Sequence, residues 1–316
     1  PLPVSRVPCL LPASPQRATY PPGTMVKFLI AVVVIGLVGV VGGGWYFSNE
    51  LITQEPSAVP APPPELDARP LSFVSDGLEI RGWYVEGGND CGLLFLHGRG
   101  GTRAQPLPWR VPFEGLDCHH VLIDARAHGE SEGTFHSYGV HERHDAALAL
   151  DWLERRTGLG EGQLGVVGMS YGAATALQML PDHQDLAFVL ADSSFSSLRD
   201  VARFQAVEQF DDWVLALFEP AVVISGLRAG FDVDDAAPER AVVANEVPVL
   251  VVHDVDDPYT PFEQALAIAA ADPGDPLVLV PFEGDADHHQ MVLTQTERYT
   301  RVVADFLAEF APEFGG

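Results

Sequence analysis

Apolar and polar positions follow two different periods along the chain after residue 70. Short apolar runs rich in Val, Leu and Phe predict strands, and runs with apolar residues three or four positions apart predict helices. The predicted strands are residues 71–75, 78–87, 92–98, 119–125, 163–169, 186–192, 247–254 and 276–284. Helical spacing is found between them, at 141–156, 261–271 and 296–310. This alternation predicts an α/β fold with a mostly parallel central sheet and helices on both faces.

Two segments depart from the alternation. Asp76-Gly77 joins the first two strands and predicts a hairpin turn. Residues 193–247 contain no clear central strand and predict two or three helices rich in phenylalanine and other apolar residues. A small helical cap over a site is the functional interpretation of residues 193–247, and ordinary helices packed on the sheet are the alternative.

A longer apolar stretch precedes the alternating region. Phe28–Phe47 carries no charge over 20 residues, enough at ~1.5 Å per residue to cross a hydrocarbon core of ~30 Å. Lys27 precedes it and Glu50 follows, so the positive-inside rule predicts an extracytoplasmic C-terminal domain. A cleaved signal peptide is the alternative. No Ala-x-Ala site follows the run, which favours a transmembrane anchor over residues 25–47.

The segments on either side of this anchor are rich in proline. Residues 1–24 precede the first methionine, and we expect a disordered leader or a mis-assigned start there. Residues 48–69 predict a semi-extended tether. The folded domain is therefore expected over residues 70–312.

Composition limits the class of partner. The chain has 44 acidic and 18 basic residues, a net charge of −26. Such a charge argues against nucleic acid, or an anionic membrane surface, as the main partner of the soluble part. The apolar content of 47% is that of an ordinary globular protein. No nucleotide- or metal-binding motif is evident, so no cofactor is implied.

The candidate catalytic residues follow the carboxyl ends of predicted strands, the edge at which parallel sheets place their sites. A serine stands in Gly-x-Ser-x-Gly spacing, acidic residues follow a later strand, and histidines follow the last one, the chain order Ser, Asp, His. The stretches concerned are "LHGRGG" (96–101), "DARAHGES" (124–131), "GMSYG" (168–172), "HDVDDPYTP" (253–261) and "FEGDADHHQ" (282–290).

Together these spaced motifs resemble those of the α/β-hydrolase superfamily, from about Pro70 to the C-terminus. "LHGRGG" is similar to the family's His-Gly oxyanion loop and "GMSYG" to its nucleophile elbow. Two departures are Ala127 and Asp254, which stand where the family has glycine. Among subgroups the chain resembles membrane-anchored serine hydrolases of the serine-aminopeptidase-like and acyl-protein-thioesterase-like kind.

The resemblance and the strand-end spacing assign roles. Ser170 is the expected nucleophile, with Tyr171 N–H and Arg99 N–H as oxyanion donors. The His-x-x-x-Asp spacing from His253 favours Asp257 as the acid, with Asp254 and Asp256 as competitors. The resemblance further implies that His97, Asp124 and Arg126 brace the loops.

The base lies in a pair of adjacent histidines. Spacing from the strand and the family's Ala/Gly-x-His pattern favour His288 over His289. The expected function is that of a serine hydrolase cleaving carboxylic esters or thioesters through an acyl-enzyme. The alternatives are a peptidase of the serine aminopeptidase type and a catalytically inactive hydrolase fold used as a binding module.

Two cysteines, Cys91 and Cys118, open predicted strands. If those strands are parallel neighbours in register, the cysteines meet, and an exported domain permits a disulfide. Two buried free thiols are the favoured interpretation from the residues, since adjacent parallel strands are not a favoured disulfide site. The family strand order supports the in-register pairing.

Overall fold

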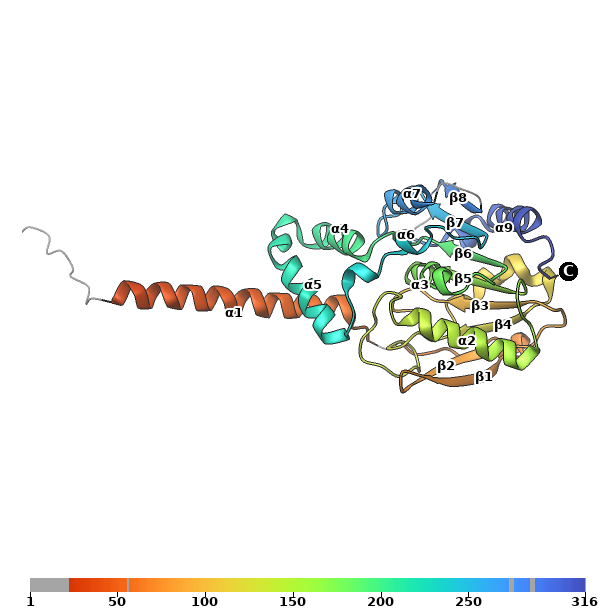
Figure 1. Cartoon of the computed structure of the whole chain (residues 1–316), viewed down its shortest axis with the longest axis horizontal. Coiled ribbons are helices and arrows are strands. Elements are labelled where there is room, and N and C mark those ends of the chain that lie inside the picture. The colour runs from red at the N-terminus through yellow and green to blue at the C-terminus, as the bar shows by residue number, and fades with distance from the viewer. Residues whose placement is uncertain (1–22, 56, 273–275, 285–287, 316) are drawn as a thin grey trace, which may run out of the picture. The chain divides into compact units, whose positions relative to one another are not determined.

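The computed structural model describes residues 23–55, 57–272, 276–284 and 288–315. The leader expected over residues 1–24 lies outside these ranges, apart from its last two residues. The chain divides into two compact units between Gly42 and Gly43. The second unit contains the whole of the sheet and its helices (Figure 1).

One eight-stranded sheet forms the centre of the second unit, in the order β1-β2-β4-β3-β5-β6-β7-β8. The two β1–β2 and β2–β4 pairs are antiparallel, and all other neighbours are parallel. The predicted mostly parallel sheet is thereby confirmed. The strands are β1 (Arg69–Ser75), β2 (Leu78–Val85), β3 (Gly92–Leu96), β4 (His119–Ile123), β5 (Leu164–Met169), β6 (Phe188–Asp192), β7 (Val249–Asp254) and β8 (Leu277–Phe282).

Helices cover both faces of this sheet, each with its own apolar core. On one face Ala146, Leu150 and Leu153 of α2 are buried on one stripe, because helical spacing of three and four places them together. That face carries α2 (Glu142–Thr157), α3 (Tyr171–Met179), α6 (Pro238–Ala241) and α7 (Phe262–Ala271). The other carries the 3₁₀ helix η2 (Leu107–Leu116), α8 (Met291–Thr294) and α9 (Thr296–Phe310).

The hairpin predicted at Asp76-Gly77 is present. Ser75 pairs with Leu78, and the two residues between them have φ of 50° and 82°. Two successive positive φ values give the turn whose twist matches that of the flanking strands, and Asp-Gly is a favoured pair for it.

Residues between β6 and β7 form the predicted helical insertion. It consists of α4 (Leu198–Phe210), η4 (Asp212–Val214), α5 (Leu215–Ala229), η5 (Val233–Asp235) and α6. Ser197 starts α4 as its N-cap, accepting from the backbone N–H of Asp200. Arg199 of α4 pairs with Asp234 of η5, which holds the insertion together.

Helix α1 spans Thr24–Ile52, so it includes the first five residues of the expected tether, 48–52. The reason is packing, because Ile52 is fully buried and the last turns of α1 contact α5. A Cβ on Gly44 would lie 3.0 Å from Ile224 and from Pro220. The described part of the remaining tether, residues 53–55 and 57–68, holds one short 3₁₀ helix, η1 (Pro64–Leu66).

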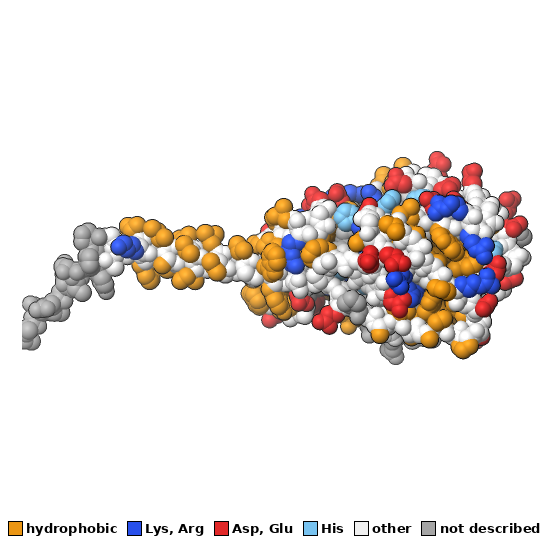
Figure 2. Space-filling view, turned by 90° about the horizontal axis from the view of Figure 1, so that it is seen from below, with side chains coloured by type: hydrophobic (Ala, Val, Ile, Leu, Met, Phe, Trp, Pro, Cys, Tyr) orange, Lys and Arg blue, Asp and Glu red, His pale blue; other side chains and the backbone are white. Residues whose placement is uncertain are grey.

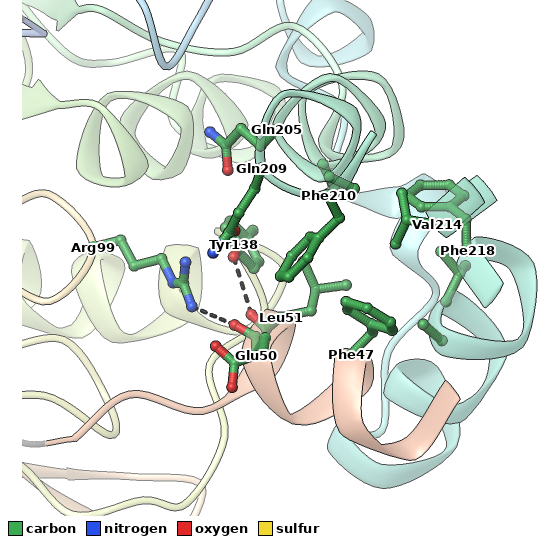
Figure 3. Close-up of a pocket in the computed structure, with 14 residues that line it drawn as sticks. Phe47, Glu50, Leu51, Arg99, Tyr138, Gln205, Gln209, Phe210, Val214 and Phe218 are labelled. Carbon is green, nitrogen blue, oxygen red and sulfur yellow. Dashed lines mark hydrogen bonds between the residues drawn. The ribbon is translucent and has the colours of Figure 1, made fainter. Parts of the chain in front are cut away.

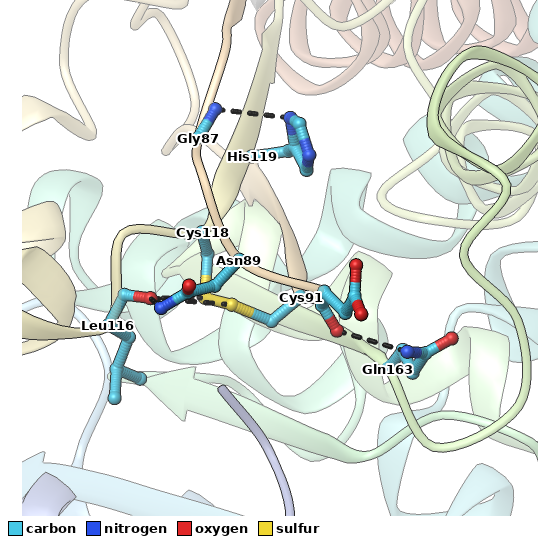
Figure 4. Close-up of a disulfide and its surroundings, with 8 residues drawn as sticks. Gly87, Asn89, Cys91, Leu116, Cys118, His119 and Gln163 are labelled. Atoms are coloured by element: carbon cyan, nitrogen blue, oxygen red, sulfur yellow. Dashed lines mark hydrogen bonds between the residues drawn. A yellow bond between two sulfur atoms is a disulfide. The ribbon is translucent and has the colours of Figure 1, made fainter. Parts of the chain in front are cut away.

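Cys91 and Cys118 form a disulfide, which corrects the expectation of two buried thiols (Figure 4). Gly92 of β3 pairs with His119 of β4, so the preceding residues also face each other, with 4.8 Å between their Cα atoms. That separation lies within the range a disulfide requires. The bond ties the amino ends of two neighbouring strands, at the edge opposite Ser170.

Candidate active site

Ser170 lies on a sharp turn between β5 and α3. Its φ of 51° and ψ of −115° are strained for a residue with a side chain, a conformation typical of a nucleophile elbow. The turn requires glycine on both sides. A Cβ on Gly168 would lie 2.3 Å from the Gly172 carbonyl oxygen, and one on Gly172 would lie 2.3 Å from that of Leu96. The backbone N–H of Ser170 donates to the carbonyl of Asp192, 2.7 Å away.

Three predicted site residues meet in one hydrogen-bonded chain. The Oγ of Ser170 lies 2.7 Å from Nε2 of His288, and Nδ1 of His288 lies 2.5 Å from Oδ2 of Asp257. The other oxygen of Asp257 accepts from the backbone N–H groups of Tyr259 and Thr260. The arrangement can pass a proton from a hydroxyl to an imidazole that a carboxylate orients.

The surroundings of Asp257 favour its ionised form. Burial raises the pKa of this carboxyl, but the hydrogen bond from His288 and the backbone donors outweigh burial and hold the pKa below its ordinary value. The two competing acids lie elsewhere in the turn. Asp254 accepts from the backbone N–H of Asp256, and the side chain of Asp256 is exposed.

His289 lies beside His288 but faces a different group. Its ring packs edge-on against Trp109, with 5.8 Å between centroids. Burial lowers the pKa of His289, although the neighbouring carboxyl of Asp192 opposes this effect. Burial raises the pKa of Asp192, which accepts hydrogen bonds from Trp109 Nε1 at 2.7 Å and from the Tyr299 hydroxyl at 2.9 Å.

The loop after β3 lies against Ser170. A Cβ on Gly98 would lie 3.7 Å from the Ser170 Cβ, and Arg99 and Tyr171 both line the cavity that contains Ser170. Gln105 holds this loop by accepting from the Gly98 backbone N–H at 2.9 Å. The two residues expected to supply oxyanion donors therefore border the same space as the serine hydroxyl.

His97 holds the loop after β3 through two hydrogen bonds to the backbone. Its Nε2 accepts from the Ala125 backbone N–H at 2.9 Å, so its Nδ1 carries the proton and donates to the Gly98 carbonyl at 2.7 Å. Burial lowers the pKa of His97 to about 3, which keeps the ring neutral and preserves this pattern at neutral pH.

Two buried carboxylates hold the adjoining turn. Asp124 accepts from the backbone and the guanidinium of Arg103, and from the Glu130 backbone N–H. Arg126 makes a bidentate pair with Asp145 at 2.7 and 2.6 Å. Asp124 thus joins two loops, Arg126 ties its loop to α2, and neither residue lines the Ser170 cavity.

Two groups of residues near the site were missed by the sequence reasoning. The cluster of Asp192, Trp109 and Tyr299 had one readable signal, an aspartate ending a predicted strand. Leu51 and Gln54 line the Ser170 cavity, yet they fall in the segment expected to be a tether, and nothing in their sequence context marks them. Within the ranges that the structure describes, no three His, Cys, Asp or Glu side chains are grouped to hold a metal ion.

Comparison with known sequences shows that the chain is similar to known hydrolases. Residues 119–223 match the family described as X-Pro dipeptidyl-peptidase (S15 family). The Bacillus subtilis protein YqkD, named uncharacterized, is 27% identical over 237 residues, covering 73% of this chain and 76% of its own. The lysophosphatidylserine lipase ABHD12 of Macaca fascicularis is 26% identical over 244 residues, covering 70% of this chain and 56% of its own.

Solved structures share the fold. The Pyrococcus furiosus esterase Pf2001 superposes with a TM-score of 0.66 at 20% identity, covering 82% of this chain and 98% of its own. The Pyrococcus horikoshii acylaminoacyl peptidase superposes with a TM-score of 0.61 at 15% identity, covering 77% of this chain and 41% of its own.

Proposed function

Because the chain belongs to the α/β-hydrolase superfamily, we propose that it is a serine hydrolase that cleaves carboxylic esters or thioesters. One observation carries the proposal, the hydrogen-bonded chain from Ser170 through His288 to Asp257. A serine hydroxyl is a weak nucleophile until an adjacent base takes its proton, and this chain supplies that base and its partner.

The reaction follows from these positions. Ser170 Oγ attacks the carbonyl carbon while its proton passes to Nε2 of His288, and Asp257 stabilises the imidazolium that forms. The tetrahedral intermediate collapses, His288 gives the proton to the leaving oxygen or sulfur, and an acyl-enzyme remains. Water then attacks the acyl carbon while His288 accepts its proton. The bond between the acyl carbon and Ser170 Oγ breaks, His288 returns the proton to Oγ, and the carboxylic acid leaves.

The charge that develops on the carbonyl oxygen needs donors. Arg99 and Tyr171 line the cavity that contains Ser170, and their backbone N–H groups are proposed to supply these donors. Tyr171 is also the first residue of α3, whose positive dipole end points into the same space. One such donor typically changes the rate by ~10²–10³.

The chain is also proposed to be a membrane-anchored protein with its catalytic domain outside the cytoplasm. Helix α1 is long and apolar enough to cross a membrane, and its hydrophobic side chains are exposed (Figure 2). Trp45 and Tyr46 are exposed where the apolar run ends, as in interfacial anchors. The Cys91–Cys118 disulfide suits an oxidising compartment.

Replacing the nucleophile tests the proposal. Ser170→Ala is expected to lower kcat for 4-nitrophenyl ester hydrolysis by about 10⁴-fold or more and to abolish fluorophosphonate labelling. Ser72→Ala, a change at an exposed serine of β1, is the matched control. Hydrolysis by Ser170→Ala at the wild-type rate would sink the proposal. A wild-type chain that neither labels nor hydrolyses would instead indicate a binding module.

A peptidase activity is the second candidate, since residues 119–223 match a peptidase family. Esterase and peptidase activity would use the same nucleophile, so a change at Ser170 cannot distinguish them. Esters and amides of the same acyl group can, because only the bond that is cleaved differs. The proposed esterase is expected to have the higher kcat/KM on the ester series after correction for the intrinsic reactivity of each bond. Preference for the amide series would support the peptidase.

A further inference from the structure

An apolar pocket adjoins the Ser170 cavity and is closed on one side by the end of α1 (Figure 3). We refer to it as the anchor-side pocket. Its larger apolar side chains come from α1, α4, η4 and α5, and its volume is about 130 Å³. These residues are Phe47, Leu51, Phe210, Val214, Phe218 and Val222.

The anchor-side pocket and the Ser170 cavity share five of their lining residues. Leu51, Arg99, Tyr138, Ala202 and Gln205 line both of them. The two spaces are therefore adjacent, on either side of these residues. Since an engineered apolar cavity of about 150 Å³ holds one benzene, the anchor-side pocket has room for roughly six carbon atoms.

The α1 wall of this pocket is held rigidly by the catalytic domain. The last carbonyls of a helix have no partner within it, and here loops of the site supply partners. The Glu50 carbonyl accepts from the Arg99 guanidinium, and the Leu51 carbonyl accepts from the Tyr138 hydroxyl at 3.0 Å. The Ile52 carbonyl accepts from the His136 backbone N–H at 3.1 Å.

Aromatic packing fixes the far end of the pocket. The Phe47 ring packs edge-on against Phe210, with 5.1 Å between centroids, and lies 6.2 Å from the ring of Trp213. A Cβ on Gly43, one helical turn before Phe47, would lie 2.8 Å from Leu217 of α5. The Leu217 side chain would have to shift to admit a side chain at this position.

The place of the pocket along the chain indicates its ligand. Phe47 is the last residue of the uncharged run that is proposed to span the membrane, and it also lines the pocket. An apolar pocket at the end of a membrane span, adjacent to the cavity of a nucleophile, fits the hydrocarbon part of an amphiphilic ester.

We propose that the anchor-side pocket is an acyl-binding site that takes the distal part of a long unbranched acyl chain, with α1 supplying one wall. The inference rests on the proposed serine hydrolase function. In this arrangement the anchor helix is part of the substrate site as well as a tether. An acyl chain of about ten or more carbons passes Arg99 and Tyr138 and ends against Phe47 and Phe210, whereas an acetyl group stays beside Ser170.

Filling the pocket from α4 tests this inference on the full chain in detergent. Ala206 lines the anchor-side pocket but not the Ser170 cavity. Ala206→Phe is expected to lower kcat/KM on 4-nitrophenyl dodecanoate at least tenfold more than on 4-nitrophenyl acetate. The same substitution at Ala216, which is exposed on α5 and lines neither cavity, is expected to leave the dodecanoate-to-acetate ratio at the wild-type value.

A substitution in α1 that enlarges the pocket is expected to have the opposite effect on long-chain esters. Phe47→Ala enlarges the pocket and is expected to move the best chain length, in a series from acetate to hexadecanoate, upward by two or more carbons. An unchanged chain-length profile in both variants, or an equal loss on every ester in both, overturns the acyl-binding site. A wild-type chain that is inactive on acetate and is not labelled by a fluorophosphonate overturns the hydrolase function instead.

Discussion

His288 and His289 are adjacent in the sequence, but only tertiary contacts distinguish their surroundings. His288 bridges Ser170 and Asp257, whereas His289 packs on Trp109 beside Asp192. The residues are of one type and differ by one position, so no local period separates them. Their difference comes from which way the backbone turns, and His289 has a φ of 47°.

Exchanging the two histidines for alanine separates their roles. His288→Ala is expected to lower kcat on 4-nitrophenyl acetate by roughly 10³–10⁴, because Ser170 loses its base. His289→Ala is expected to cost at least 100-fold less, because it removes a wall contact and not a proton acceptor. Circular dichroism of both variants monitors folding, and a larger loss for His289→Ala would reverse the assignment.

Strand register decides the state of the cysteines. Cys91 and Cys118 precede paired positions of β3 and β4, and a shift of one residue would move their side chains to opposite faces. The helix that comes before the domain decides the compartment in which they meet. If α1 exports the domain, the pair oxidises in the cell.

Alkylation of cells that express a Cys9→Ser chain tests both the pairing of Cys91 with Cys118 and the compartment of the domain. The two remaining thiols are expected to gain alkyl groups only after reduction, as seen by mass. A matched chain that lacks Phe28–Phe47 stays in the reducing compartment and is expected to be alkylated without reduction. Alkylation of the complete chain before reduction would contradict the extracytoplasmic placement.

Acid sensitivity is a property of the whole folded domain. Burial lowers the pKa of His97 and of His120 to about 3, whereas an unfolded histidine titrates near ~6.5. Between these values the unfolded chain binds more protons than the folded one. Stability is therefore fully present above pH ~6.5 and falls as the pH drops toward 3.

His120→Gln removes the contribution of His120 to the pH dependence of stability. Glutamine is chosen because it keeps an acceptor for the 2.7 Å hydrogen bond from Arg110. The wild type is expected to lose about 2 kcal/mol more than the variant in free energy of unfolding between pH 8 and pH 5. Urea unfolding at both pH values measures it. His144→Gln, at an exposed site on α2, is expected to keep the wild-type dependence, and an equal dependence in His120→Gln would refute the assignment.

The strands of the sheet, the order of helices and strands along the chain, and the strand ends that hold the polar site residues could all be predicted from the sequence. These follow from local signals, because period two and period 3.6 specify buried faces, and parallel strands bring their carboxyl ends to one edge. Ser170 could be predicted because the tight elbow requires glycine at 168 and 172. The spacing favours Asp257 over Asp254 and Asp256 as the acid, and spacing together with the family pattern favours His288 over His289 as the base.

Whether Ser170, Asp257 and His288 meet, and what surrounds them, depends on the tertiary structure. His288 lies 31 positions from Asp257 and 118 positions from Ser170 in the sequence, and no local pattern encodes contacts over such separations. Likewise, Leu51 belongs to a segment whose proline content predicts a tether. It lines the site because the end of α1 packs on α5 and because Arg99 donates a hydrogen bond to one of the last carbonyls of α1.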